Sequence, residues 1–162
     1  MDSLSSYLAN QDHGVFTYFS VLLDDPLFAL LITALAFLLV VKVKTPRASP
    51  LFLSLVVAFF SVPFLKGLFA VARPCPEFIA KIACPSSASF PSGHATVSGA
   101  FLLASVGTPL FLPFLTLAIL VSISRVYLGI HYLADVAAGI ALGFVLYAFS
   151  ERLYYVYRKA IG

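Results

Sequence analysis

Residues 26–41 contain no charged side chain, and several comparable apolar runs follow along the chain. Of the 162 residues, 61% are hydrophobic and only 10% are charged, and the mean hydropathy is +1.02. These values are far from those of a typical soluble globular protein. We therefore predict an integral membrane protein whose fold is an all-α helical bundle.

Five segments are predicted to cross the membrane, at residues 26–41, 51–72, 95 to about 106, 109 to about 126, and 132–149. Several fall short of the roughly 20 residues that an upright spanning helix needs, so tilt or a locally thinner bilayer would have to accommodate them.

Residues 2–23 mix apolar and polar positions, and we expect one or two short amphipathic helices there, at the membrane interface. His13 belongs to this stretch and is interpreted as polar surface. No repeat or linker marks a second domain, so residues 1–162 are predicted to form one membrane-embedded domain.

Three short polar motifs interrupt the apolar sequence. They are motif 1, Lys66-x6-Arg73-Pro74; motif 2, Pro91-Ser92-Gly93-His94; and motif 3, Ser124-Arg125-x5-His131-x3-Asp135. Ionisable groups are costly in membrane-like surroundings, so their presence indicates a functional site. The three cations, two imidazoles and one carboxylate of these motifs fit an oxyanion, and phosphate fits best.

The distribution of basic residues predicts how the chain is oriented. Basic residues follow the first predicted span at Lys42, Lys44 and Arg47, and the fifth at Arg152, Arg158 and Lys159. With five spans both groups fall on one side, which the positive-inside rule assigns to the cytoplasm. The N-terminus is then outside, the C-terminus inside, and all three motifs lie at the outer ends of the spans. The net charge of +3, without a basic tract, does not favour a nucleic-acid partner.

In motif 3, His131 and Asp135 are four residues apart and would share a helix face. A carboxylate that accepts a hydrogen bond from one ring nitrogen leaves the other unprotonated, which prepares a nucleophile or general base. A structural His–Asp pair would have the same spacing. Gly129 permits a turn between Arg125 and His131, so both can face one pocket, although a snorkelling arginine is the alternative.

In motif 1, Lys66 and Arg73 are seven residues apart, so on an unbroken helix they would share a face about 10.5 Å apart along the axis. Their long side chains could then converge on one phosphate, and Pro74 would end the helix. Taken singly, Lys66 could instead be a snorkelling interface residue.

In motif 2, Ser92 is a candidate N-cap of the following helix, whose free amides would face an anion. Gly93 would let a substrate approach the backbone closely. His94 would then lie in the first turn, placed to donate a proton to a leaving oxygen. An ordinary cap followed by a core histidine would have the same sequence.

Cys75 and Cys84 lie in the polar stretch between motifs 1 and 2. A disulfide is plausible if that loop faces an oxidising compartment, but two thiols do not prove a bridge. A metal site would need further ligands nearby.

Taken together, the motifs resemble the signature of the type 2 phosphatidic acid phosphatase (PAP2) superfamily, which also contains vanadium haloperoxidases and bacterial acid phosphatases. The family pattern is K-x6-RP, PSGH and SR-x5-H-x3-D, and this sequence matches all eleven fixed positions, in order, within residues 66–135. The match covers less than half of the chain. The apolar segments are similar to those of the membrane lipid phosphatase branch.

The resemblance implies a role for each matched residue. His131 would attack phosphorus to form a phosphohistidine and Asp135 would orient it, while His94 would protonate the leaving oxygen and later help to activate water. The phosphoryl oxygens would be held by Lys66, Arg73, Ser92, Arg125 and the amide of Gly93, with Ser124 supporting the site. No metal or other cofactor is expected, because the protein's cations would do the work that Mg²⁺ does elsewhere.

We therefore expect a multi-pass cell-membrane lipid phosphatase whose active site faces the extracytoplasmic side and whose partners are its lipid substrate and the bilayer. Expected substrates are polyprenyl pyrophosphates such as undecaprenyl or dolichyl pyrophosphate, phosphatidate and phosphatidylglycerol phosphate. The sequence identifies neither the lipid nor the oligomeric state.

Other functions are compatible with the same motifs. A lipid phosphotransferase could use the same residues, and an inactive scaffold would keep the same motifs. A haloperoxidase would be soluble, and a transporter or channel is disfavoured because there is no repeat and the charges gather at one face.

Overall fold

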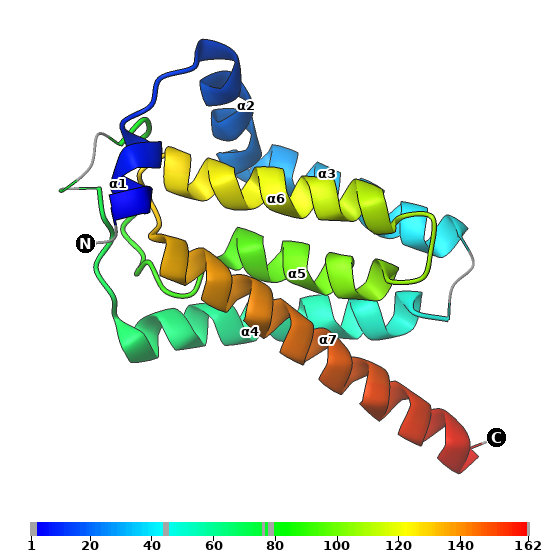
Figure 1. The fold of residues 1–162 in the computed structure, drawn as a ribbon. Coiled ribbons are helices and arrows are strands. Elements are labelled where there is room, and N and C mark those ends of the chain that lie inside the picture. The colour runs from blue at the N-terminus through cyan, green and yellow to red at the C-terminus, as the bar shows by residue number, and fades with distance from the viewer. Residues whose placement is uncertain (1–2, 44–45, 76, 78–79, 162) are drawn as a thin grey trace.

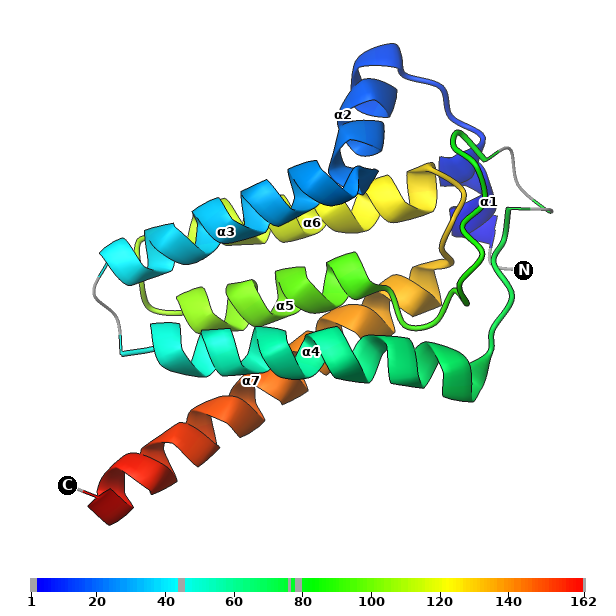
Figure 2. The ribbon, with the colours of Figure 1, turned by 180° about the vertical axis from the view of Figure 1, so that it is seen from behind.

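The computed structural model describes residues 3–43, 46–75, 77 and 80–161, and these form seven helices and no strand. The helices are α1 (Ser3–Ala9), α2 (Gly14–Asp24), α3 (Pro26–Lys42), α4 (Ala48–Phe69), α5 (Gly93–Ser105), α6 (Phe111–Tyr127) and α7 (Leu133–Ile161). The helices α3 to α6 run side by side, and α7 crosses α4 and α5 obliquely before its C-terminal part projects beyond the bundle (Figures 1 and 2). The predicted all-α membrane bundle is confirmed.

Helices α3 to α7 occupy the five segments predicted to cross the membrane. Within the described residues, α4 and α7 are long and apolar enough to span alone, and α2 with α3 passes the same test as a pair bent by 81°. The helices α3 and α6, with 17 residues each, and α5, with 13, are shorter than an upright span needs. The count of five spans therefore stays a prediction.

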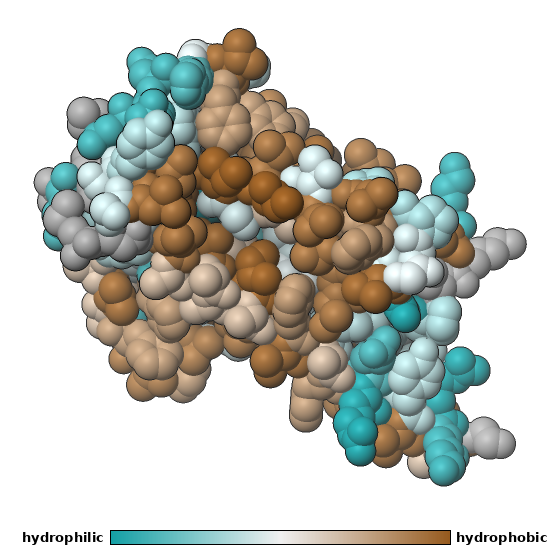
Figure 3. All heavy atoms as spheres, in the orientation of Figure 1, coloured by the Kyte–Doolittle hydropathy of each residue, from teal (hydrophilic) through white to brown (hydrophobic). Residues whose placement is uncertain are grey.

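The outer surface of the bundle has the character of a lipid-facing protein. Figure 3 shows hydrophobic residues over the middle of the visible face and hydrophilic residues gathered towards its two ends. Side chains such as Phe59, Phe60 and Val145 are more than half exposed. Such a belt is unfavourable in water but matches the hydrocarbon core of a bilayer.

Small residues let α5 and α7 approach each other closely. A β-carbon at Gly143 would lie 2.2 Å from the carbonyl oxygen of Thr96, and one at Gly139 would lie 2.5 Å from that of Ser92. Neither position has room for any side chain, so the backbones pack directly, as small-residue motifs allow in membranes. This contact fixes the start of α5 against the start of α7.

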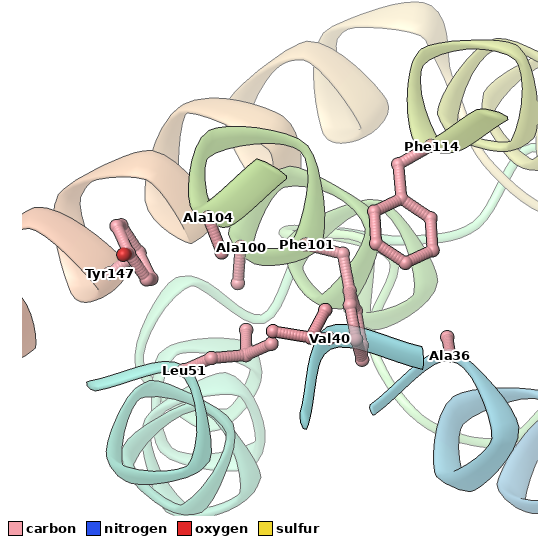
Figure 4. Packing of buried hydrophobic residues seen from close by; sticks show 8 residues of the cluster. All are labelled: Ala36, Val40, Leu51, Ala100, Phe101, Ala104, Phe114 and Tyr147. Carbon is pink, nitrogen blue, oxygen red and sulfur yellow. The ribbon is translucent and has the colours of Figure 1, made fainter. Parts of the chain in front are cut away.

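A cluster of buried side chains joins five helices around α5 (Figure 4). Its members are Ala36 and Val40 of α3, Leu51 of α4, Ala100, Phe101 and Ala104 of α5, Phe114 of α6 and Tyr147 of α7. The rings of Phe101 and Phe114 lie 5.3 Å apart, centroid to centroid, which is within the range of favourable aromatic contacts. The cluster holds the helices in place around the central α5.

The two N-terminal helices pack on one end of the bundle. The Oγ of Ser5 in α1 accepts a hydrogen bond from the first amide of α7, at Leu133, with a length of 3.0 Å. Lys81, in the loop before α5, donates to the last carbonyls of both α1 and α6, at Ala9 and Tyr127. These bonds satisfy helix-end groups that would otherwise lack partners. They tie α1 and the loop to the end where the polar motifs lie.

At the opposite end of the bundle, the connection between α3 and α4 contacts α7. The Nε of Arg47 lies 3.8 Å from a carboxylate oxygen of Glu151, so the connection between α3 and α4 lies beside the middle of α7. Arg152, Arg158 and Lys159 are on the projecting part of α7, whose helix continues to Ile161 rather than ending near Phe149 as predicted. Lys44 lies outside the described residues. Which side of the membrane this end faces stays a prediction.

Candidate active site

The three polar motifs meet at the end of the bundle that carries the N-terminus (Figure 1). Motif 1 runs from the last turn of α4 into the following loop, motif 2 begins α5, and motif 3 joins the end of α6 to the start of α7. Segments that are far apart in the sequence therefore contribute to a single site.

His131 and Asp135 lie together at the start of α7. The Nδ1 of His131 is 3.4 Å from the Oδ2 of Asp135, and the side chains are only 5% and 3% exposed. Asp135 Oδ2 also accepts hydrogen bonds from the amide of Tyr132, at 2.8 Å, and from the hydroxyl of Ser89. A carboxylate held by three donors is fixed in place, and it directs Nδ1 of the imidazole inwards and Nε2 outwards.

The outward Nε2 of His131 faces a cation, because Nη1 of Arg73 lies 3.4 Å away. Burial lowers the pKa of His131; its hydrogen bond to Asp135 works in the opposite direction, and the charges of Arg73 and Lys66 lower the pKa further. The neutral imidazole is thereby favoured, which is the form that can act as a nucleophile.

Arg73 reaches the site from the loop and not from a helix. The helix α4 ends at Phe69, where Ala70 takes the left-handed conformation with φ of 47°. The expectation that Lys66 and Arg73 share a helix face, with Pro74 ending the helix, is therefore wrong. The chain turns at Ala70 because that residue's amide bonds the carbonyl of Lys66 and closes the helix.

Both cations of motif 1 are nevertheless tied to one short segment. Lys66 donates to the carbonyl oxygens of Ala88 and Ser89, while Nε and Nη2 of Arg73 donate to the carbonyl and hydroxyl of Ser87 at 2.7 and 3.1 Å. Segment 87–89 therefore sets where the two cations sit.

The loop that carries this segment is closed by a disulfide between Cys75 and Cys84, whose Cα atoms are 5.9 Å apart. In the chain-entropy view, such a cross-link limits the conformations of the unfolded loop. The disulfide lies between Arg73 and Ser87 in the sequence and shortens the loop that must position them.

Motif 2 places its side chains at the start of α5. Ser92 is the N-cap residue, with extended backbone, but its hydroxyl makes no capping bond; within the described residues the buried Oγ has no hydrogen-bond partner. The Ser92 amide donates instead to the carbonyl of Asp135, at 3.0 Å. His94 lies in the first helical turn, as its position after Ser92 predicts. A buried hydroxyl without a partner is costly, so Ser92 is suited to bind a ligand.

Arg125 lies in the last turn of α6, fully buried, and its guanidinium is directed towards α2. Nη1 donates to Asp24 at 2.6 Å, Nη2 to the carbonyl of Ser20 at 3.0 Å, and Nε to the hydroxyl of Ser124 at 3.1 Å. Its charge also acts on His94. Ser124 thus supports Arg125.

Two cavities adjoin the motifs. One, of about 750 Å³, lies between α3, α4, α5 and α6, is lined mainly by hydrophobic side chains, and reaches Gly93 and His94. Leu30 and Phe59, which also line it, are 64% and 73% exposed, so the cavity extends to the lipid-facing surface. The other, of about 870 Å³, is lined by the end of α4 and the loop, including Lys66 and Arg73.

A cation-rich site does not resemble a metal centre. Among the residues that the structure describes, no three His, Cys, Asp or Glu side chains form a group that could hold a metal ion. The arrangement of imidazoles, cations and a free hydroxyl instead fits an anion.

A family model described as the PAP2 superfamily matches residues 26–159, which include all three motifs. The chain belongs to the PAP2 superfamily. The predicted family is thereby confirmed.

Relatives of this PAP2 protein include several proteins that are named as phosphatases. A decaprenylphosphoryl-5-phosphoribose phosphatase of Mycobacterium tuberculosis is 43% identical over 81 residues, which cover 49% of this chain and 45% of the relative. Phosphatidylglycerophosphatase B of Bacillus subtilis is 37% identical over 101 residues, covering 51% of this chain and 49% of the relative. The chain thus spans about half the length of these curated relatives.

A solved structure supports the fold of the whole PAP2 chain. LpxE of Aquifex aeolicus superimposes with a TM-score of 0.74 at 23% identity, covering 92% of this chain and 93% of that one. The two chains therefore share the helical arrangement described above.

Several residues with direct contacts to the site of this PAP2 protein were not predicted from the sequence, Ser89 and Asp24 among them. Ser89 bonds Asp135, and Asp24 pairs with Arg125. Ser89 sits among several serines of a loop, and Asp24 precedes an apolar run next to Asp25, which caps α3 by accepting a bond from Phe28 at 2.8 Å. Neither has a spacing to the motifs that would have singled it out.

Proposed function

We propose that this PAP2 protein is a membrane lipid phosphatase that hydrolyses a lipid phosphate or pyrophosphate through a phosphohistidine at His131. The observation that carries the proposal is the orientation of His131, whose Nδ1 faces Asp135 and whose Nε2 faces Arg73. A phosphoryl group bound at Arg73 would therefore lie in front of the nucleophilic nitrogen.

The first step breaks the bond between the terminal phosphorus and the oxygen that bridges it to the rest of the lipid. His131 Nε2 attacks phosphorus, the P–N bond forms, and the electron pair of the broken bond goes to the leaving oxygen, which takes a proton from His94. In the second step a water gives its proton to His94 and attacks phosphorus, which releases phosphate and frees His131. His131 would thereby be regenerated, and water would be the only reactant consumed besides the lipid.

The charged groups around His131 would stabilise the phosphoryl group during both steps. Lys66 and Arg73 would hold its oxygens from the loop side and Arg125 from the side of α6, while Ser92 Oγ and the Gly93 amide would donate to it. Asp135 would stabilise the positive charge that develops on the His131 ring when Nε2 bonds phosphorus.

The apolar cavity supports a lipid as the leaving group. His94, the proposed proton donor, lies at the end of the cavity of about 750 Å³ that opens between the helices. A hydrocarbon chain in this cavity would hold the lipid so that the bridging oxygen of its terminal phosphate comes near His94. Polyprenyl pyrophosphates, phosphatidate and phosphatidylglycerol phosphate all carry such a terminal phosphate, and we propose that they are hydrolysed at the extracytoplasmic face.

A phosphate-release assay with purified protein and chelator tests the proposal. The substrates are the three lipid classes and a water-soluble phosphate ester, with vanadate as inhibitor and His131→Ala as the control variant. We expect metal-independent release from at least one lipid, inhibition by vanadate and loss of activity in His131→Ala. Release at the wild-type rate by His131→Ala would refute the phosphohistidine, and equal turnover of the soluble ester would refute a lipid substrate.

A further inference from the structure

The last turn of α2 contacts the candidate active site from outside the three motifs. Asp24 and the carbonyl of Ser20 accept hydrogen bonds from the two terminal nitrogens of Arg125, at 2.6 and 3.0 Å. Between them in the sequence, Leu23 lines the same cavity as His94. One helical turn thus bonds a proposed phosphate ligand and borders the cavity that the proposed proton donor also lines.

This turn presents negative charge to Arg125. Asp24 carries a carboxylate, and the carbonyls at a helix C-terminus carry the negative end of the helix dipole. Arg125 is fully buried and needs such a partner, because an unpaired buried charge is strongly unfavourable. The Asp24 side chain is 29% exposed, so its carboxylate lies between the buried guanidinium and the surface.

We propose that Asp24 competes with the substrate: its carboxylate occupies the anion-binding side of Arg125 and must be displaced there by the phosphoryl group. The proposal rests on the proposed function in taking a phosphoryl group as the ligand of Arg125. In the described structure, Arg125 forms its ion pair with Asp24, and its hydrogen bonds go to Asp24, Ser20 and Ser124 and not to His131. To hold a phosphoryl group in front of His131, the guanidinium has to exchange one anion for another.

The exchange sets how strongly a phosphate must bind before it reaches Arg125. The Asp24 carboxylate carries one negative charge, and so does a phosphodiester, which gains little by replacing it. A terminal phosphate carries a charge of about −1.5 to −2 at pH 7 and three acceptor oxygens, so it outcompetes a carboxylate at a guanidinium. Asp24 thereby weakens the binding of every phosphate by the free energy of the pair that must be broken, and a terminal phosphate binds strongly enough to break it.

The substitution Asp24→Asn tests this competition. Asparagine keeps the size and one acceptor oxygen, so it can still bond Arg125, but it removes the charge. We expect the inhibition constant of inorganic phosphate to fall about tenfold, equivalent to about 1.4 kcal/mol. We also expect the inhibition constant of the monoanion dimethyl phosphate to fall by a similar factor, because either anion has to displace the same carboxylate.

The neighbouring Asp25→Asn is the matched control. It removes the same charge one residue later, from a carboxylate that accepts from Phe28 and does not bond Arg125. Both inhibition constants should match those of the wild type. A weaker inhibition by phosphate in Asp24→Asn, or a lower kcat with unchanged inhibition constants, would overturn the proposal, because it would mean that Asp24 holds Arg125 in place for the reaction.

A second measurement does not depend on turnover. We expect inorganic phosphate to raise the midpoint of thermal unfolding more in Asp24→Asn than in the wild type or in Asp25→Asn, because phosphate supplies the anion that Arg125 has lost. Equal shifts in the three proteins would overturn the proposal. Absence of phosphate release by the wild type from every lipid would instead refute the proposed function, and the two failures are therefore separate.

Discussion

The guanidinium of Arg73 links three parts of the site through one planar group. It bonds Ser87 through two nitrogens, donates to the carbonyl of Ile130 at 2.8 Å, and lies 3.4 Å from His131. An ammonium group is a point charge and cannot make these bonds in the same geometry. The shape of this side chain therefore matters as much as its charge.

We expect Arg73→Lys to lower kcat/KM about 10²–10³-fold, the loss typical of removing one donor to a transition-state oxyanion. Phosphate release from the preferred lipid measures it. The control is Arg152→Lys, the same substitution at an exposed position on α7, which should leave the rate unchanged. A kcat/KM of Arg73→Lys within threefold of the wild-type value would contradict this prediction and show that a positive charge at residue 73 is enough for phosphate release.

His131 should remain neutral to a lower pH than an ordinary histidine. Burial, with the charges of Arg73 and Lys66, lowers its pKa against the opposing effect of Asp135. Titration of the ¹⁵N-labelled imidazole by NMR, assigned with His131→Ala, should give a midpoint below 6.5. A midpoint at or above that value would contradict the described environment.

At the scale of helices, the packing of α5 on α7 depends on having no side chain at Gly143. An added methyl group there would meet the carbonyl oxygen of Thr96 at 2.2 Å, which forces the two backbones apart. Since Thr96 also bonds the carbonyl of Ser92, a shift of α5 would move the start of motif 2.

We therefore expect Gly143→Ala to lower the free energy of unfolding by about 1–3 kcal/mol, as overpacked substitutions do, and to reduce activity. Unfolding in a denaturing detergent measures the first effect. Gly67→Ala in α4 is the matched control, because nothing lies within 4 Å of its β-carbon position, and it should cause no loss of stability. Equal stability of the two variants would contradict the close packing of α5 and α7.

Elements made of continuous apolar sequence were predictable to within a few residues. The first predicted span, 26–41, is α3 at Pro26–Lys42, because Asp25 and Pro26 mark its start in the sequence. Motif 1 was misjudged, since nothing local showed that Ala70 would leave the helix before Arg73. The Gly139-x3-Gly143 pattern was present in the sequence but was not used, although it predicts a close helix contact.

The direction of the Arg125 side chain could not be predicted from the sequence, because it depends on a contact between distant parts of the chain. The spacing of motif 3 placed Arg125 near the turn that leads to His131, which the structure shows. Its partner Asp24 is 101 residues earlier in the chain, and only the folded arrangement of α2 brings the two together.

At the scale of the whole molecule, the position of the two ends across the membrane can be measured. The structure has no free cysteine among its described residues, so a single introduced thiol can be labelled selectively. We expect Asn10→Cys, at the end of the bundle that carries the motifs, to react with a membrane-impermeant maleimide in intact cells.

Lys159→Cys, on the projecting end of α7, should react only after the membrane is permeabilised. Both positions are exposed, so access alone does not separate them. The reverse pattern would place the site in the cytoplasm and contradict the predicted orientation.

The open side of the apolar cavity also determines how a lipid would be encountered. Because Leu30 and Phe59 line the cavity and also face the surrounding hydrocarbon, a chain can enter sideways without passing through water. The search for a ligand is then two-dimensional, and its rate depends on the fraction of bilayer molecules that are ligand rather than on the amount per volume of solution. Inert lipid added at a constant amount of ligand would therefore lower the rate at which the protein binds its ligand, because it lowers the ligand's share of the bilayer.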